Sequence, residues 1–488
     1  MEDRASTSGL GLADRRSWAL FALAMAVYLA TRLYALDRFP IFFHADEAFG
    51  PLTAADLLRN GLTDAYQRFL PVYFEPAPNR WMPIGTVYAH LLPVALWGTR
   101  VVVTRATTAV VTALGAAAVA LTLRDAFRSR LWWAGALVIG AMPAWFIHSR
   151  AGFEAAMMTA LFAVFLWCYA RYRRDGGAAF ACAAVLAGAA TFYAYSNGQS
   201  VMAVLGLALV VVDARHHWRR RRALAPALAL ALVLAVPFVR FRVAHPGAEV
   251  QHLKAIGAYI VDDALTPGQK AIGFARRYAF ALHPRFWFVS HDVDNVLAPL
   301  EARWPALKPY VSLGNPLDIQ RHRYRGRGHI ALWMLPLFLV GLAAAVRRWR
   351  SPPHRLVLLA ILAAPVGAAT AQIGITRVMA FLVPAAILVT LGLEAAIGWI
   401  GRRWPRCRRI ARRPGVDVGG ASTAVAALCF VGLAGANVEL LASRCCGLRP
   451  ALVRRLRPVR HAVGRQPTVR RIRRCCGDRI KVMKITSD

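Results

Sequence analysis

The chain has 488 residues, 57% of them hydrophobic, and its mean hydropathy is +0.42. This composition excludes an ordinary soluble globular protein and favours a chain that crosses a membrane several times. The net charge of +36 would suit nucleic-acid binding, but the arginines lie in short blocks between apolar runs, which excludes a nucleic-acid partner. The 8 cysteines lack the spacing of a zinc site, so no metal centre is predicted.

Apolar runs close to the length of a membrane-spanning helix, about 20 residues, recur along the chain. The first is too long for a signal-peptide core and is expected to remain as a span. The stretch 82–97 is shorter and is expected to lie in the membrane interface, because a span there would invert every later arginine block. We therefore predict an all-α polytopic integral membrane protein with spans at 17–36, 103–123, 131–147, 153–170, 178–195, 199–214, 223–240, 329–346, 356–371, 378–399 and 421–441.

The arginine blocks between alternate spans mark the cytoplasmic side, because positive charge is retained there. This rule places residues 1–16 in the cytoplasm and makes 37–102 and 241–328 two outer loops of a membrane domain over 17–441. The expected location is the cytoplasmic (inner) membrane of a bacterium, with the active site facing the periplasm or the cell exterior.

The tail 442–488 is rich in arginine, although an odd number of spans and an inside N-terminus would place it outside. Our hypothesis is a shift of the reading frame after the last span, so that 442–488 is not the native tail. The gene's DNA, read in all frames, tests this hypothesis, and an arginine-rich tail in every frame would contradict it.

The segment His44-Ala45-Asp46-Glu47-Ala48 follows the first predicted span directly. A charge at the centre of a bilayer costs about 2.5–3.5 kcal/mol. The pair of acids is therefore expected at the outer edge of the membrane, where it can meet both a lipid and a water-soluble molecule.

Several short motifs at predicted outer ends of spans resemble, in this order, the polytopic glycosyltransferases of the GT-C fold, which use polyprenyl-phosphate sugars. Within these enzymes the chain is most similar to the family of protein O-mannosyltransferases and aminoarabinose transferases, over residues 17–400. Glu154 stands where that family more often has aspartate. The motifs are Asp46-Glu47-Ala48, 54–61, Trp81-Met82-Pro83, Arg105, His148-Ser149-Arg150, 191–195, Thr376-Arg377 and Pro384.

The resemblance implies a GT-C helical bundle with about 11 transmembrane helices and two extracytoplasmic loop regions. It also implies transfer of a hexosyl or pentosyl group from a polyprenyl-phosphate donor to a cell-envelope glycan, a lipid or a protein hydroxyl. Two alternatives are a lipid or sugar transporter or flippase, which would need charged or broken helices at mid-membrane, and a non-catalytic membrane scaffold.

Asp46 is predicted to be the general base of this reaction. Glu47 is expected to assist by orienting the acceptor, binding an arginine or helping to hold a divalent cation. Adjacent side chains on a helix point about 100° apart, so the two acids cannot form the close pair of a double-displacement enzyme. A single, inverting displacement is therefore predicted, and the alternative is that Asp46 merely caps or charges a helix N-terminus.

Arg150 and Arg377 lie at the outer ends of different predicted spans. A guanidinium can grip a phosphate with two parallel hydrogen bonds, so both are candidates to bind the donor phosphate. The alternative is that they reach toward lipid headgroups. Arg105 is expected to anchor its own span or to pair with an acid of the first outer loop.

His44, Tyr193 and Tyr195 are weaker substrate-binding candidates on the same face. The histidine could assist proton transfer and the tyrosines could stack on a sugar, but all three also suit an interfacial aromatic belt. His291-Asp292-Val293-Asp294 in the second outer loop is a further weak candidate for the acceptor side.

Overall fold

The structure is a computed structural model that describes residues 2–40, 43–78, 80–289, 322–324, 326–403 and 418–446. The chain divides into two units, Met1–Cys445 and Cys446–Asp488, and the description that follows concerns the first. The candidate His291-Asp292-Val293-Asp294 and the predicted tail beyond residue 446 lie outside the described residues.

The N-terminal part consists of one long helix, a compact segment of short elements and a second long helix. Glu47 accepts the backbone N–H of His44 at 3.3 Å, which helps to start the second helix at Ala45. That helix runs on through Gly50-Pro51 without a break. The elements are α1 (Glu2–Leu33), α2 (Ala45–Arg59), β1 (Tyr73–Ala77), β2 (Arg80–Pro83), α3 (Val87–Trp97) and α4 (Val101–Asp125).

The antiparallel hairpin of β1 and β2 corrects the expectation of an all-α chain. It pairs Tyr73 with Pro83 and Phe74 with Met82, and the ladder becomes irregular before Ala77 pairs with Arg80. The segment contains several prolines, which disfavour a helix because each lacks the backbone N–H of the helical ladder. For the same reason the helix predicted over 82–97 begins only at Val87.

The middle of the chain forms the centre of the bundle, where α4 packs on α7 and α7 packs on α8. Gly115 of α4 lies so close to Ala160 of α7 that an added Cβ would be 2.7 Å from the Ala160 Cα. The elements here are α5 (Ala134–Gly140), α6 (Pro143–His148), α7 (Glu154–Asp175), α8 (Ala178–Ala194), α9 (Ser196–Val212), α10 (Ala214–Arg219) and α11 (Arg221–Ala244).

The span predicted over 131–147 is wrong as a single helix, because α5 and α6 divide it. Pro143 has no backbone N–H to continue the ladder of α5, and its ring favours the first turn of a new helix. Both short helices are fully buried, so the break lies inside the bundle.

The C-terminal part completes the bundle with α18 packed along α22. Gly341 and Gly392 permit this close approach, because a Cβ on either would meet a backbone carbonyl of the opposite helix. The elements are α12 (Ala248–Ala255), η1 (Tyr259–Val261), α13 (Pro267–Leu282), α14 (Pro284–Phe288), η3 (Leu332–Met334), α18 (Leu335–Arg347), α19 (Pro352–Ala363), α20 (Val366–Ala369), α21 (Ile375–Val378), η4 (Met379–Phe381), α22 (Leu382–Arg403) and α24 (Val418–Cys446).

Within the described ranges, 5 helical segments are long and apolar enough to cross a membrane. Shorter apolar helices lie at four further predicted spans, formed by α8, α9, the segment Leu332–Arg347 and the segment Ala426–Ala442. These helices support a multi-pass membrane protein, whereas the number eleven stays a prediction. The 5 segments are α4, α7, α11, Pro352–Ala369 and Ile375–Trp399.

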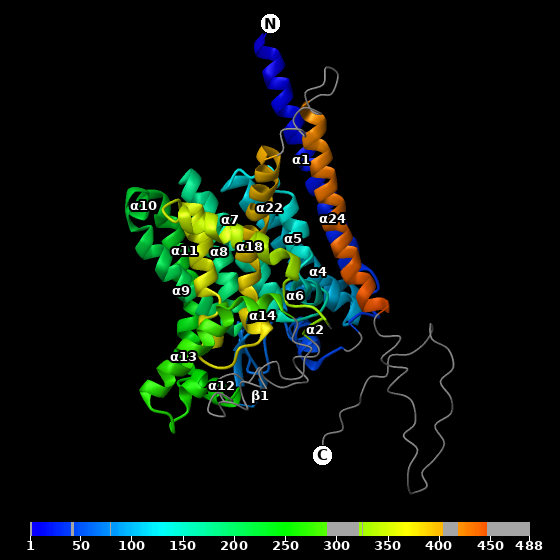
Figure 1. The fold of residues 1–488 in the computed structure, drawn as a ribbon. Coiled ribbons are helices and arrows are strands. Elements are labelled where there is room, and N and C mark those ends of the chain that lie inside the picture. Colours follow the sequence, from blue (N-terminus) through cyan, green and yellow to red (C-terminus); the bar gives the residue numbers. More distant parts are fainter. Residues whose placement is uncertain are drawn as a thin grey trace, which may run out of the picture. The chain divides into compact units, whose positions relative to one another are not determined.

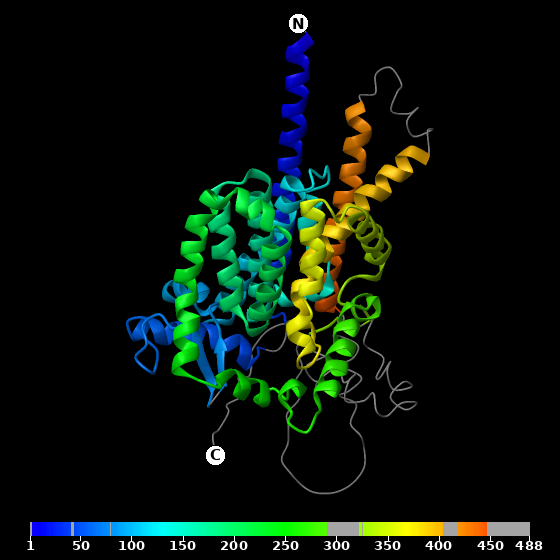
Figure 2. The ribbon, with the colours of Figure 1, turned by 90° about the vertical axis from the view of Figure 1, so that its left-hand side faces the viewer.

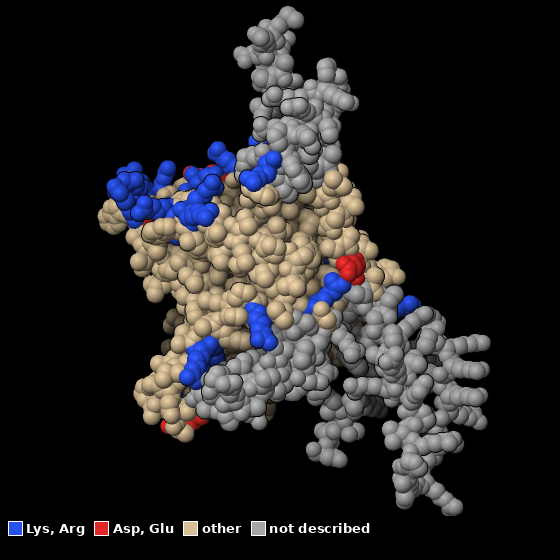
Figure 3. Space-filling model, in the orientation of Figure 1, with Lys and Arg blue, Asp and Glu red and all other residues tan. Residues whose placement is uncertain are grey.

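The two ends of the bundle differ in chemistry. The start of α1 and helix α10 lie at one end, while α2, the β1–β2 hairpin and α12 lie at the other (Figures 1 and 2). Lysine and arginine gather near α10 at the first end, and an almost uncharged band separates them from charges at the second end (Figure 3). We call these the arginine-rich end and the loop end.

Candidate active site

The two adjacent acids at the start of α2 have separate surroundings. Asp46 is exposed at the loop end, whereas the Glu47 side chain is only 1% exposed. Glu47 accepts the Arg105 Nε–H at 3.0 Å and the backbone N–H of Gly152 at 2.9 Å. Of the alternatives considered for Glu47, the structure shows the pairing with an arginine.

Arg105 ties this pair to the loop after α1. Its Nη1 donates to the carbonyl oxygens of Leu36 at 2.9 Å and Pro40 at 2.8 Å, and its side chain is 1% exposed. The contact therefore joins the loop after α1, the first turn of α2, helix α4 and the link before α7. A buried ion pair of this kind needs such additional hydrogen bonds to offset desolvation.

Arg150 serves the same loop rather than a cavity. It is buried, and its guanidinium donates to the carbonyl oxygens of Thr31, Arg32, Tyr34 and Phe39 at 2.5–3.2 Å. These bonds satisfy the carbonyls at the end of α1 and hold the chain that leads to α2.

Arg377 lies elsewhere, in the short helix α21, and is half-buried. Its Nη1 donates to the Gln372 carbonyl oxygen at 3.2 Å. The charge of Arg377 acts on Tyr195 and on His252 of α12, so these three side chains are neighbours.

Glu154 and Arg80 complete the group. Glu154 is the first residue of α7 and is close enough to Asp46 and to Arg80 for their charges to act on it. Arg80 begins β2, is exposed, and forms no ion pair with any described residue. Its charge also acts on His252.

Burial, followed by the charges of Arg80 and Arg377, lowers the pKa of His252 to about 4. The imidazole is therefore neutral near pH 7 and adds no positive charge of its own there. Together these residues, from six segments, form what we call the outer cluster: Asp46, Arg80, Glu154, Tyr195, His252 and Arg377.

Two other sequence candidates take part in packing. The Tyr193 hydroxyl donates to the Leu234 carbonyl at 2.7 Å and accepts the Phe238 N–H at 3.1 Å, so it inserts into the hydrogen-bond ladder of α11. His44 precedes α2 and donates its backbone N–H to Glu47.

The structure places Asp46 within range of Glu154 and Arg377 within range of Tyr195, and it places Glu47, Arg105 and Arg150 in the frame that supports the loop. Arg80 and His252 were not predicted from the sequence. The position of Arg80 next to the motif Trp81-Met82-Pro83 was a usable signal, whereas nothing local in the sequence of α12 points to His252.

The outer cluster can act on an oxygen nucleophile and on an anion at the same time. Asp46 and Arg80 lie within range of Glu154 for their charges to act on it, and Arg80 and Arg377 both act on His252. Among the described residues, no group of three or more histidine, cysteine, aspartate or glutamate side chains could hold a metal ion.

No protein-family model matches the chain, and no curated protein matches it. Its fold is similar to that of ArnT from Cupriavidus metallidurans in the apo state, with a TM-score of 0.51 and 15% identity, covering 92% of this chain and 79% of ArnT. It is also similar to the archaeal oligosaccharyltransferase AglB from Archaeoglobus fulgidus in complex with an inhibitory peptide and a dolichol-phosphate. That match has a TM-score of 0.51 and 14% identity over 88% of this chain and 55% of AglB.

The apo form of the Archaeoglobus fulgidus enzyme gives the same result, with a TM-score of 0.50, 14% identity, and coverage of 88% of this chain and 56% of that enzyme. The chain thus spans most of ArnT and about half of the archaeal enzyme. At this identity the matches show the fold, and they confirm the predicted resemblance to the GT-C fold of membrane glycosyltransferases.

Proposed function

We propose that the protein is a membrane glycosyltransferase that moves a sugar from a polyprenyl-phosphate donor to a hydroxyl group of an extracytoplasmic acceptor. The observation that supports this most is the outer cluster, in which acids and arginines from separate elements come within range of one another's charges at the loop end. The shared fold with ArnT and AglB supports the same reaction class, and AglB was solved with a dolichol-phosphate.

In this proposal Asp46 removes the proton from the acceptor hydroxyl. The hydroxyl oxygen then bonds to the anomeric carbon of the sugar while the bond from that carbon to the phosphate oxygen breaks. The leaving phosphate keeps the electron pair and its growing negative charge is stabilised by Arg377 and Arg80. One displacement inverts the configuration at the anomeric carbon.

The remaining residues support this chemistry by position. Glu154 lies beside both Asp46 and Arg80 and would orient the guanidinium toward the phosphate. Neutral His252 leaves the attraction for phosphate to the two arginines. Glu47, Arg105 and Arg150 hold the loop that leads into α2, and Asp46 projects from the first turn of that helix. The loop end then faces the outside and the arginine-rich end the cytoplasm.

Deletion of the gene tests the reaction class. We expect the deletion strain to accumulate a polyprenyl-phosphate sugar and to lose one extracytoplasmic glycoconjugate, as seen in a lipid profile and a glycan profile. The purified full-length protein should then transfer that sugar from the accumulated lipid to deletion-strain membranes in detergent. A transporter or flippase would have no such activity, because detergent removes the compartments. Unchanged profiles would contradict the proposal.

Arg377→Gln and Arg150→Gln should have different effects. A hydrogen bond to a charged group contributes about 1.5–3 kcal/mol, so Arg377→Gln should lower kcat/KM about 10- to 100-fold with an unchanged melting temperature. Arg150→Gln should lower the melting temperature, because it leaves buried carbonyl oxygens without a hydrogen-bond donor. Transfer kinetics and thermal unfolding in detergent measure both. An Arg377→Gln enzyme with wild-type kcat/KM would remove this arginine from the proposal.

A further inference from the structure

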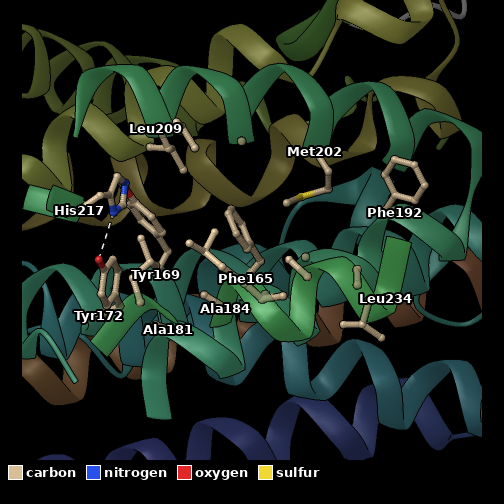
Figure 4. A pocket seen from close by; sticks show the side chains of 18 of the residues that line it. Phe165, Tyr169, Tyr172, Ala181, Ala184, Phe192, Met202, Leu209, His217 and Leu234 are labelled. Atoms are coloured by element: carbon tan, nitrogen blue, oxygen red, sulfur yellow. Dashed lines mark hydrogen bonds between the residues drawn. The ribbon is translucent and has the colours of Figure 1, made fainter. Parts of the chain in front are cut away.

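A groove of about 900 Å³ runs between α7, α8, α9 and α11, away from the outer cluster (Figure 4). Its walls are apolar, with Phe165, Met202 and Leu234 among them. Helix α11 lies at the edge of the bundle, since 11% of its apolar window is buried, against 78% for α7. We call this groove the α8–α11 groove.

The groove ends before it reaches the loop end of the protein. There, Phe192 and Phe238 meet edge to face with ring centroids 5.4 Å apart, and the Tyr193 hydroxyl bridges α8 to α11. From Arg221 to Phe238 the groove follows seventeen residue steps of α11, or about 26 Å at 1.5 Å per residue. That length is most of a hydrocarbon core about 30 Å thick, so an acyl chain that enters from one leaflet has room in the groove.

The other end of the groove opens at the arginine-rich end. Trp218 and Arg221 line this mouth, and Trp218 is 72% exposed, as tryptophan is where a protein meets lipid headgroups. The Arg221 guanidinium carbon lies 5.6 Å from the Trp218 ring centroid. His217 also lines the mouth but is engaged by the Tyr172 hydroxyl at 3.0 Å (Figure 4).

The charges around this mouth are not balanced by acids among the described residues. Asp213, which precedes α10, already pairs with Arg173 at 2.9 Å and with Arg355 of α19. The run Arg219–Arg222 therefore leaves a local excess of positive charge beside an apolar groove. An apolar chain with an anionic head matches both features.

We infer that the α8–α11 groove binds an anionic glycerophospholipid from the leaflet at the arginine-rich end, with an acyl chain in the groove and the phosphate at Arg221. In the orientation of the proposed function this is the cytoplasmic leaflet. The site is thus separate from the donor site, because the proposed donor phosphate binds at the opposite end. The lipid fills the space that α11 leaves against α8 and α9.

Native mass spectrometry of the purified full-length protein in detergent tests this site, with phosphatidylglycerol and phosphatidylcholine as probes. Wild type should bind one phosphatidylglycerol more tightly than phosphatidylcholine. Gly206 lines the groove, and a Cβ there would meet no atom within 4 Å, so Gly206→Leu is the variant chosen to fill the groove. Each displaced methylene costs about fourfold in affinity, so this variant should bind both lipids about tenfold more weakly.

Arg221→Gln should weaken phosphatidylglycerol binding about fivefold and leave phosphatidylcholine binding unchanged, as expected for one charge at the headgroup. Gly432→Leu in α24 is the matched control for volume, because a Cβ there also meets no atom within 4 Å. Arg347→Gln, exposed at the end of α18, is the control for charge.

Equal binding of the two lipids by wild type would overturn the inference. So would equal phosphatidylglycerol affinity in the Gly206→Leu and Gly432→Leu variants, provided that both melt at the wild-type temperature. An Arg221→Gln variant that loses both lipids equally would overturn the placement of the phosphate. None of these readouts involves sugar transfer, so failure here leaves the proposed function standing.

Discussion

Asp46→Asn is expected to lower the rate of sugar transfer about 10²- to 10⁴-fold, the usual contribution of a general base. The melting temperature should not change, because Asp46 is exposed and forms no ion pair within the described ranges. The measurement is transfer of labelled sugar by purified variants, from the lipid that accumulates in the deletion strain.

Asp56→Asn provides the matched control, since it removes a second exposed carboxylate from the same helix. Among the described residues Asp56 pairs with Arg59 alone, on the surface, where an ion pair contributes little. This variant should transfer sugar at the wild-type rate. An Asp46→Asn enzyme within a few-fold of wild type would show that another group takes the proton.

The second large effect is expected at the buried pair of Glu47 and Arg105. Glu47→Gln or Arg105→Met should each lower the free energy of unfolding by about 3–5 kcal/mol, because each leaves the other charge buried without its partner. The double variant Glu47→Leu/Arg105→Met should regain part of that loss, since no isolated charge remains. Denaturant unfolding in detergent measures all three variants.

Transfer activity of the same variants separates a structural role of Glu47 from a catalytic one. If Glu47 only supports the loop, the double variant should regain activity along with stability. A Glu47→Gln variant that unfolds like wild type but transfers no sugar would assign Glu47 to the chemistry, and the proposed division between the two acids would be wrong.

Much of the bundle could be predicted from hydropathy, because a lipid-facing or buried helix must be apolar over most of its length. The helix starts at 101, 154 and 221 agree with predicted spans within a few residues. Hydropathy could not predict the break at Pro143, because both halves of that run are equally apolar. The β1–β2 hairpin was missed because its short strands contain proline and lack a regular alternation.

The site was less predictable, because its members come together only through the tertiary fold. The same residue type, arginine at the outer end of a helix, became a loop support at position 150 and a member of the outer cluster at 377. The two roles differ because the end of α1 and the loop after it fold over Arg150 and take up its hydrogen bonds. His252 lies 172 positions from Arg80 (252 minus 80), in a different outer loop, so no local pattern could join them.

The contact of Glu47 with Arg105 and Gly152 explains why the two neighbouring acids stand in the order Asp46-Glu47. Glu47 reaches both the Arg105 guanidinium and the Gly152 amide with the extra methylene that aspartate lacks, while its shorter neighbour stays in water. A homologue in which the two letters were exchanged would have the same composition and charge, yet its inner acid would be too short to reach both groups. A comparison with distant relatives should therefore consider the order of the aspartate and the glutamate as well as their presence.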